Sequence, residues 1–141
     1  MEFEFIKSKV YYKIFDRSYK ASSGIYSKYK YNDAVKLAEV QQNIDNIKSA
    51  YSPAELFVLK QTHSNEVVYA DLDNHYTFPE ADGSVTLEKN LALSILTADC
   101  TPVLFASSDG SVIGAAHCGW RSAKANIIAN IDVYISSAKI V

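Results

Sequence analysis

The chain has 141 residues, of which 48% are hydrophobic, 21% charged and 12% aromatic, and its fourteen basic and sixteen acidic side chains give a net charge of −2. These values are typical of a single globular domain and exclude a disordered or collagen-like chain. Basic residues do not outnumber acidic ones, which argues against nucleic-acid binding. The apolar runs are too short to span a membrane. The N-terminus does not resemble an export signal, so we expect a cytoplasmic protein. In that reducing compartment its two cysteines are expected to be free thiols.

The first thirty residues predict a β-hairpin followed by a loop. Acidic and aromatic side chains alternate in residues 2–5, which is the period of a half-buried strand. Residues 9–16 are rich in β-branched and aromatic side chains, so we expect a second strand, joined to the first through Lys7–Lys9. Residues 17–31 are polar and irregular and predict a loop.

A helix is predicted next. We expect Asn32 to cap its N-terminus, Asp33 to lie in its first turn, and Ser52-Pro53 to end it. Its apolar residues recur at intervals of three and four, which predicts one buried stripe: Leu37, Val40, Ile44 and Ile47.

The pattern after Pro53 is rich in strands. Residues 56–61 and 66–70 are short apolar runs separated by a polar break. Residues 91–100 form a nearly continuous apolar run that predicts a buried strand ending at Cys100. His75 lies in a loop full of turn formers, where we expect a solvated surface histidine.

The last part of the chain predicts a hairpin and a helix. Asp109-Gly110 separates two apolar runs, and glycine tolerates the positive φ of a tight hairpin turn. From Arg121 the apolar residues return to helical spacing up to Ile135. The chain stops soon afterwards without a helix-ending signal, which is unusual for a complete domain.

Three residues are candidates for a metal-binding or catalytic site: His63 in the break between two strands, Cys100 at the end of a strand, and His117 at the end of the next strand but one. Two imidazoles and a thiolate make a plausible zinc site that leaves a fourth position open. Alternatively, Cys100 is a nucleophile with His117 as its base. Residue types and spacing leave both interpretations open. Cys118 follows His117 on the same strand, so we expect it to face the opposite side and pack in the core.

Three neighbours of these residues have less specific signals. Asp99 follows an apolar strand, where it either acts as a general acid or base or caps backbone N–H groups. Arg121 begins a helix, away from the helix end that cations favour, which suggests a role in binding an anion. Trp120 is expected to lie in the core.

Four short segments, taken together and in this order, resemble the laccase-domain family, which has been named multicopper polyphenol oxidase and peptidoglycan-editing factor and is now regarded as purine nucleoside phosphorylase. The resemblance is convincing over about residues 56–130, and its most specific elements are the last two segments. The segments are Gln61–His63, Ala81–Gly83, Thr97–Pro102 and His117–Arg121.

This resemblance implies an α+β fold in which mixed β-sheets form a sandwich with flanking helices. It implies zinc at His63, Cys100 and His117, and phosphorolysis of adenosine, inosine and methylthioadenosine together with deamination of adenosine. As hypotheses, Asp99 moves protons as a catalytic residue, while Gln61 and Arg121 bind substrate, Arg121 through the phosphate.

The chain differs from the family pattern where it stops. The family continues beyond the segment that ends in Arg121, so we expect residues 1–141 to form a single, incomplete laccase-type domain whose activity is impaired. An incomplete sheet would have an open edge that favours self-association. The alternatives are a non-catalytic remnant that binds a metal or a partner, a Cys/His hydrolase, and a copper phenol oxidase. Three histidines in the whole chain argue against a multicopper enzyme.

Overall fold

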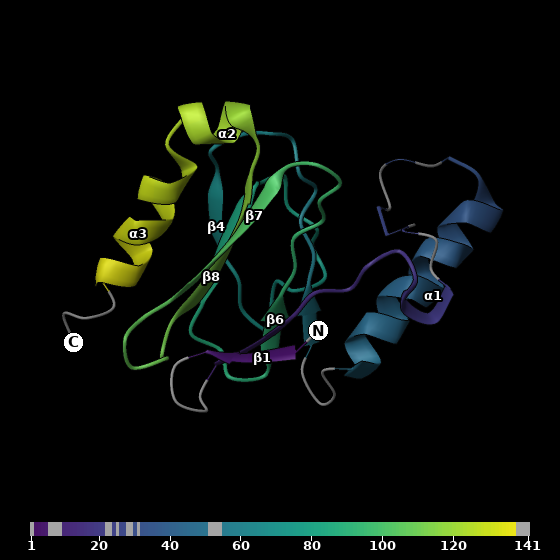
Figure 1. The fold of residues 1–141 in the computed structure, drawn as a ribbon, viewed down its shortest axis with the longest axis horizontal. Coiled ribbons are helices and arrows are strands. Elements are labelled where there is room, and N and C mark those ends of the chain that lie inside the picture. The colour runs from purple at the N-terminus through teal and green to yellow at the C-terminus, as the bar shows by residue number, and fades with distance from the viewer. Residues whose placement is uncertain are drawn as a thin grey trace. The chain divides into compact units, whose positions relative to one another are not determined.

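The computed structural model describes residues 2–5, 10–21, 24, 26–27, 30, 32–50 and 55–137. The chain divides into two compact units, Met1–Ala54 and Glu55–Val141 (Figure 1). The predicted α+β class with mixed sheets and flanking helices is confirmed, while the expectation of a single domain stays a prediction. No helix in the described ranges has the length and apolar character needed to cross a membrane.

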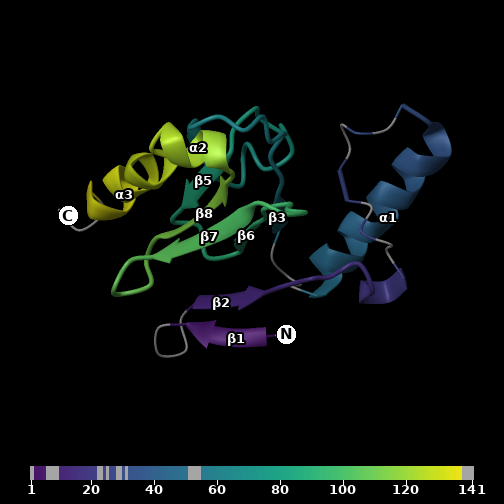
Figure 2. The ribbon, with the colours of Figure 1, turned by 45° about the horizontal axis from the view of Figure 1, so that its top comes forward.

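The N-terminal unit begins with the predicted hairpin. Strand β1 (Glu2–Phe5) pairs antiparallel with β2 (Val10–Lys13), with Phe3 opposite Tyr12 (Figure 2). The predicted connection through Lys7–Lys9 lies outside the described residues. Within the predicted loop, the structure shows a short 3-10 helix, η1 (Tyr19–Ala21), that the sequence pattern did not indicate.

Helix α1 (Ala34–Ala50) confirms the predicted helix but not its cap. The Oδ1 atom of Asp33 accepts hydrogen bonds from the backbone N–H groups of Val35 at 2.7 Å and Lys36 at 3.1 Å. Asp33 is therefore the capping residue, and the prediction of Asn32 was wrong by one position. Both residue types favour this role, so the local pattern did not distinguish them.

The buried side of α1 is narrower than the predicted stripe. Val40 and Ile44 are buried as expected, and Asn43 is buried beside them. Leu37 is 38% exposed and is not part of the buried side. The helix stop predicted at residues 52–53 lies outside the described residues.

The C-terminal unit contains two sheets, a larger one of mixed strand direction and a smaller parallel one. In the larger sheet, two neighbouring strands are parallel and the others are antiparallel; its order is β4 (Val67–Tyr69), β5 (Gly83–Thr86), β8 (Ile113–Cys118) and β7 (Thr101–Ala106). The smaller sheet pairs β3 (Glu55–Phe57) parallel with β6 (Leu91–Leu93). Two neighbouring parallel strands cannot be joined by a tight turn, so the connections between them are long. Several of the candidate site residues lie in these connections.

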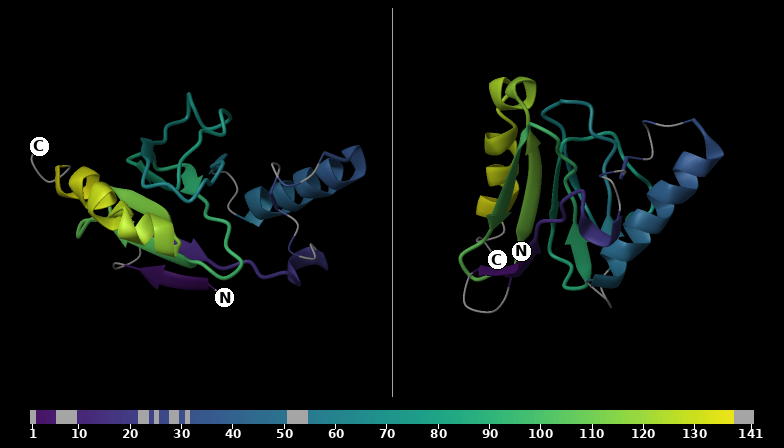
Figure 3. Two further views of the ribbon diagram at one scale, coloured as in Figure 1. Left: turned by 90° about the horizontal axis from the view of Figure 1, so that it is seen from above. Right: turned by 45° about the vertical axis from the view of Figure 1, so that its right-hand side comes forward.

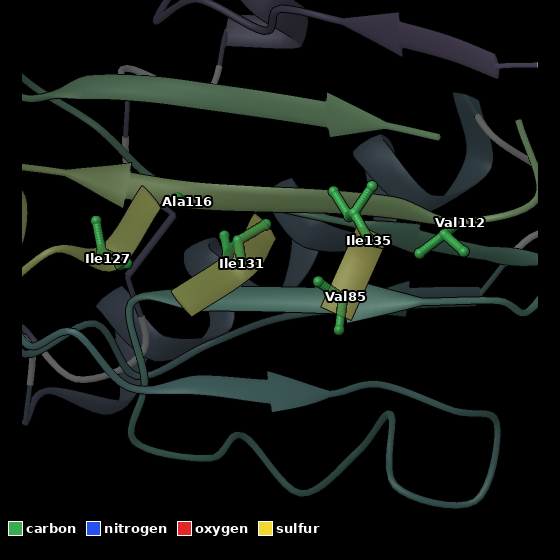
Figure 4. Packing of buried hydrophobic residues seen from close by; sticks show 6 residues of the cluster. All are labelled: Val85, Val112, Ala116, Ile127, Ile131 and Ile135. Carbon is green, nitrogen blue, oxygen red and sulfur yellow. The ribbon is translucent and has the colours of Figure 1, made fainter. Parts of the chain in front are cut away.

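The larger sheet has an apolar cluster on each face. Helix α3 (Ile127–Ser137) covers one face, where its isoleucines pack on the strands (Figure 4): the cluster is Val85, Val112, Ala116, Ile127, Ile131 and Ile135. Val67 packs against this cluster, while its neighbour Val68 packs against a second cluster around Phe57 and Leu91. Successive strand residues point to opposite faces, so the two clusters lie on opposite sides of the sheet. Figure 3 shows helix α3 running along one face of this sheet.

The strand predicted for residues 91–100 is too long. Strand β6 ends at Leu93, and the following residues are irregular. The cause is a side chain: the amide group of Gln61 donates to the Leu96 carbonyl oxygen and accepts from the Leu96 N–H, both at 2.8 Å. This pair replaces the backbone pairing of a strand, so Cys100 lies just before β7 instead of at the end of a buried strand.

The predicted C-terminal helix is two helices. Helix α2 (Trp120–Lys124) and α3 are separated at Asn126, whose φ of 65° is left-handed. The Asn65 side chain donates to the Ala125 carbonyl oxygen at 2.9 Å, and the Asn130 side chain donates to the Asn65 carbonyl oxygen at 2.9 Å. These long-range contacts stabilise the break between the two helices. Because apolar periodicity does not reveal such contacts, the sequence predicted one continuous helix. The end of the chain that lacks a stop signal, residues 138–141, lies outside the described residues.

The hairpin predicted at Asp109-Gly110 is confirmed as β7–β8. Gly110 has a φ of 72°, as its position in the turn required. The carboxylate of Asp109 accepts hydrogen bonds from the Ser107 hydroxyl at 2.6 Å and from the N–H and hydroxyl of Ser111 at 3.0 and 2.8 Å. These bonds close the turn at the end of the hairpin remote from Cys100 and His117.

Candidate metal centre

Three segments bring His63, Cys100 and His117 together. His63 lies in the loop before β4, Cys100 immediately precedes β7, and His117 is the last residue but one of β8. In the β7–β8 register Pro102 is opposite His117, which places Cys100 beside the end of β8. The possible ligand atoms of the three residues all lie within 4.8 Å of one another. Among the described residues they form a group of the type and spacing that can hold a metal ion.

A buried carboxylate orients His117. The Nδ1 atom of His117 is 2.8 Å from Oδ1 of Asp82, and the His117 backbone N–H donates to the Asp82 carbonyl oxygen at 2.7 Å. Asp82 is fully buried and His117 is 4% exposed. Because Nδ1 is engaged with Asp82, Nε2 is the nitrogen of His117 that remains for a metal.

The pKa of Asp82 is lowered although the residue is buried. Burial raises this pKa, but hydrogen bonds from His117, Ser64 and Thr62 outweigh that effect and hold it below its ordinary value. Asp82 is therefore a carboxylate in the folded protein. In the sequence, Asp82 stands out only as part of the segment Ala81–Gly83 and has no predicted role, because nothing local indicates a contact 35 residues away.

The turn that carries His63 is tied to the same carboxylate. The backbone N–H groups of Thr62 and Ser64 donate to Oδ2 of Asp82 at 2.9 and 2.7 Å. His63, between them, has a φ of 61°, a left-handed conformation that is unfavourable for a residue with a side chain. Its ring lies edge-on to that of His117, with 4.8 Å between the ring centroids.

Gly119 leaves space for the three candidate ligands. A Cβ atom on this residue would lie 3.0 Å from Sγ of Cys100 and 3.2 Å from Cδ2 of His63. Its φ of −73° is accessible to any residue, so the backbone conformation does not require glycine here. The absence of a side chain at residue 119 therefore allows Cys100 and His63 to lie close to the backbone there.

The two cysteines have different surroundings. Desolvation raises the pKa of the Cys100 thiol, and the neighbouring Asp99 carboxylate raises it further. Without a cation beside it, Cys100 is therefore a protonated thiol at neutral pH, whereas a metal would bind it as thiolate. Cys118 packs against the apolar cluster under α3, as predicted.

The other predicted site residues are arranged differently. Asp99 is exposed beside Cys100. Gln61, predicted to bind substrate, has its amide group engaged with the backbone of Leu96. Arg121 is exposed, with its guanidinium carbon 4.5 Å from the centroid of the Trp120 ring. The roles of all three residues toward a substrate stay predictions.

Two expectations were wrong. Trp120 is 68% exposed instead of buried in the core. It is the first residue of α2, and the buried residue of that short helix is Ser122. His75 is half-buried and hydrogen-bonded instead of fully solvated: Nδ1 lies 2.7 Å from the Leu72 carbonyl oxygen, and Nε2 lies 3.6 Å from a carboxylate oxygen of Glu55.

Comparison with known proteins gives a consistent result. The family model described as multi-copper polyphenol oxidoreductase laccase matches residues 12–137. The chain is 46% identical over 126 residues to the purine nucleoside phosphorylase of Rickettsia prowazekii, covering 89% of this chain and 51% of that protein. It is 44% identical to the purine nucleoside phosphorylase of Rickettsia conorii, covering 93% of this chain and 53% of that protein. The chain therefore spans about half the length of the curated relatives it matches.

Solved structures share the fold. A Neisseria meningitidis protein of the family DUF152 superposes with a TM-score of 0.64 at 26% identity, covering 77% of this chain and 43% of that one. YlmD from Geobacillus stearothermophilus superposes with a TM-score of 0.62 at 19% identity, covering 82% of this chain and 46% of that one.

Proposed function

The chain belongs to the family described as multi-copper polyphenol oxidoreductase laccase, and from that membership we propose that it carries the zinc site of a purine nucleoside phosphorylase. Its proposed substrates are adenosine, inosine and methylthioadenosine together with phosphate, and its proposed second activity is deamination of adenosine. The phosphorylase activity is proposed from the printed names of the Rickettsia relatives, of which this chain spans about half.

The observation that carries the proposal is the convergence of two imidazoles and one thiol within 4.8 Å, with His117 already oriented by Asp82. Zinc accepts this mixed nitrogen and sulfur donor set, and three protein ligands leave one position for a reactant. The bare Cα of Gly119 adds the space that the ligands need. When bound, zinc would supply a Lewis acid that activates water near neutral pH.

The remaining groups of the site have proposed roles that follow from their exposure and charge. Asp99 is an exposed carboxylate next to Cys100 and is proposed to accept and donate protons. Arg121 is an exposed guanidinium two residues after Gly119 and is proposed to bind phosphate, for which its planar donor group is suited. Gln61 is proposed to help bind the substrate indirectly: its amide group is hydrogen-bonded to the backbone of Leu96 and so holds that part of the chain in place.

The proposal is tested on the purified full chain by metal analysis and by incubation with adenosine, with and without phosphate. We expect one zinc per chain and phosphate-dependent release of adenine, with inosine as the product of deamination. His63→Ala should lose zinc and both activities, while His75→Ala, which removes a histidine outside the site, should retain them. If zinc is bound stoichiometrically and adenosine stays unchanged, the chain is a non-catalytic metal-binding protein and the phosphorylase proposal fails.

A cysteine hydrolase is the second candidate, because Asp82 and His117 form the orienting part of a Cys–His–Asp arrangement with Cys100. The raised pKa of Cys100 argues against it, since the thiolate is the nucleophile. His63 distinguishes the two: a hydrolase has no need of this imidazole, so His63→Ala would retain activity.

Copper is the alternative metal. Metal analysis of the purified protein decides between zinc and copper directly. A multicopper phenol oxidase is disfavoured because the whole chain has three histidines, and one of them, His75, is engaged with Leu72 and Glu55.

A further inference from the structure

Asp82 connects the two candidate histidine ligands. Among the described residues it is the one carboxylate that is buried, and no part of its side chain reaches solvent. It lies directly before β5, at the edge where the loop of His63 and the end of β8 meet. Burying a charge is costly unless partners compensate it, so the contacts of this carboxylate need an explanation.

One oxygen of Asp82 fixes the tautomer of His117. A carboxylate can only accept hydrogen bonds, so Nδ1 of His117, 2.8 Å from Oδ1, must carry the proton. The proton-free nitrogen is then Nε2. A neutral imidazole with a free Nε2 is the form that binds a metal ion.

The other oxygen fixes the turn of His63. Oδ2 accepts from the N–H groups of Thr62 and Ser64, and from their hydroxyls at 3.3 and 3.0 Å. Two N–H groups on either side of His63 can reach one oxygen because the chain turns at this residue, with its φ of 61°. The left-handed conformation is unfavourable for a residue with a side chain, and these four hydrogen bonds offset that cost.

We infer that Asp82 is the positioning residue of the metal centre: one carboxylate sets the proton of His117 with one oxygen and the backbone turn of His63 with the other. This inference rests on the proposed metal site. It does not make Asp82 a ligand, because both of its oxygens are already engaged with protein donors.

Asp82→Asn tests the inference because an amide cannot replace both oxygens. If the amide NH₂ faces His117, the imidazole must place its proton on Nε2, which blocks metal binding. If the NH₂ faces Thr62 and Ser64, it meets donors and releases the turn. Either arrangement should weaken binding about 10- to 100-fold, the usual effect of losing the partner of a ligand.

The experiment uses the full chain and two metals. Zinc affinity is measured by competition with a chromophoric chelator, and cobalt is added to record the visible spectrum of the thiolate-bound ion. Asp109→Asn is the matched control, because Asp109 also accepts several hydrogen bonds but lies at the other end of the β7–β8 hairpin. We expect this control to retain the affinity and the cobalt spectrum, and Asp82→Asn to change both.

A measurement on the unaltered chain covers the case in which Asp82→Asn does not fold. Long-range proton–nitrogen NMR of the metal-free protein should show His117 protonated on Nδ1, and protonation on Nε2 would overturn the inference. It is also overturned if Asp82→Asn folds and binds both metals as the unaltered chain does. A chain that binds neither metal while His117 is protonated on Nδ1 refutes the proposed metal site instead.

Discussion

At one end of the β7–β8 hairpin, Asp109 accepts hydrogen bonds from Ser107 and Ser111, each two residues away in the chain. At the other end, Asp82 accepts hydrogen bonds from Ser64 and His117, which are 18 and 35 residues away. Asp109 is exposed and Asp82 is fully buried. Both side chains satisfy several donors with one carboxylate, yet only Asp82 does so across the fold.

The difference explains what each end of the hairpin does. The Asp109 network closes within five residues, so it needs little chain ordering beyond the turn that it stabilises. The Asp82 network needs the loop of His63, the start of β5 and the end of β8 in their final places. We therefore expect substitutions at the Asp82 end to change metal affinity, and substitutions at the Asp109 end to change stability alone.

The largest effect is expected from Gly119→Ala at the Asp82 end. The new Cβ would lie 3.0 Å from Sγ of Cys100 and 3.2 Å from His63, so one of them must move. We expect zinc affinity to fall about 100-fold, the upper range for disturbed ligand positions, as measured by chelator competition. The free energy of unfolding of the metal-free chain should fall by only about 1 kcal/mol, since Gly119 is the N-cap of α2 and alanine is a poorer N-cap than glycine.

Gly114→Ala is the control for this substitution, because its Cβ would meet Val85 and Ile131 in the apolar cluster instead of the ligands. It should lower stability and leave the zinc affinity of the folded chain unchanged. Unaltered zinc affinity in Gly119→Ala would show that the glycine is not what makes room for the ligands.

Gly110→Ala is the corresponding change at the Asp109 end. Its φ of 72° is unfavourable for alanine, so we expect the chain to lose roughly 1–2 kcal/mol of stability, measured by urea denaturation. Gly110→Asn should lose less, because asparagine tolerates the left-handed conformation. Zinc affinity should be the same in both variants. A loss of affinity in either would mean that the two ends of the hairpin are coupled.

The same contrast separates what the sequence predicted from what it did not. The turn at Asp109-Gly110 was predicted because its determinants are neighbours in the chain. His63, Cys100 and His117 were identified by residue type and family resemblance, and the fold brings them together. Asp82 was missed as a functional residue because its partners are distant in sequence.

The errors within the fold have a related cause. Strand β6 ends early because a distant side chain, Gln61, binds Leu96, and the last helix breaks because Asn65 holds the chain near Asn126. Both are side-chain to backbone contacts across the fold. Apolar periodicity reports burial, so it predicted that these segments exist but not where they end.

A smaller effect is expected from Asp109→Asn as pH is lowered. Hydrogen bonds from Ser107 and Ser111 lower the pKa of Asp109 well below its ordinary value. The carboxylate therefore adds stability above its unfolded pKa of about 3.9, and this contribution is lost as pH falls through the lower folded pKa.

Urea midpoints of the unaltered chain and of Asp109→Asn should accordingly differ most near neutral pH and converge in strong acid. Asp132→Asn, on the exposed side of α3, controls for the loss of a negative charge. Midpoints of Asp109→Asn that stay parallel to those of the unaltered chain down to strong acid would contradict the predicted role of this carboxylate.

The smallest effect is expected from Arg121→Ala, beside the metal centre but outside its ligand set. The guanidinium lies over the exposed ring of Trp120, and an exposed contact of this kind contributes about 0.5–1 kcal/mol. We expect a stability loss within that range in thermal unfolding and unchanged zinc affinity. Lys124→Ala, on the same short helix, is the control for removing a positive charge. Because the proposed role of Arg121 is toward phosphate, the variant should lower phosphate-dependent turnover and leave deamination of adenosine unchanged. Weakened zinc binding would instead place Arg121 with Asp82 among the groups that support the ligands.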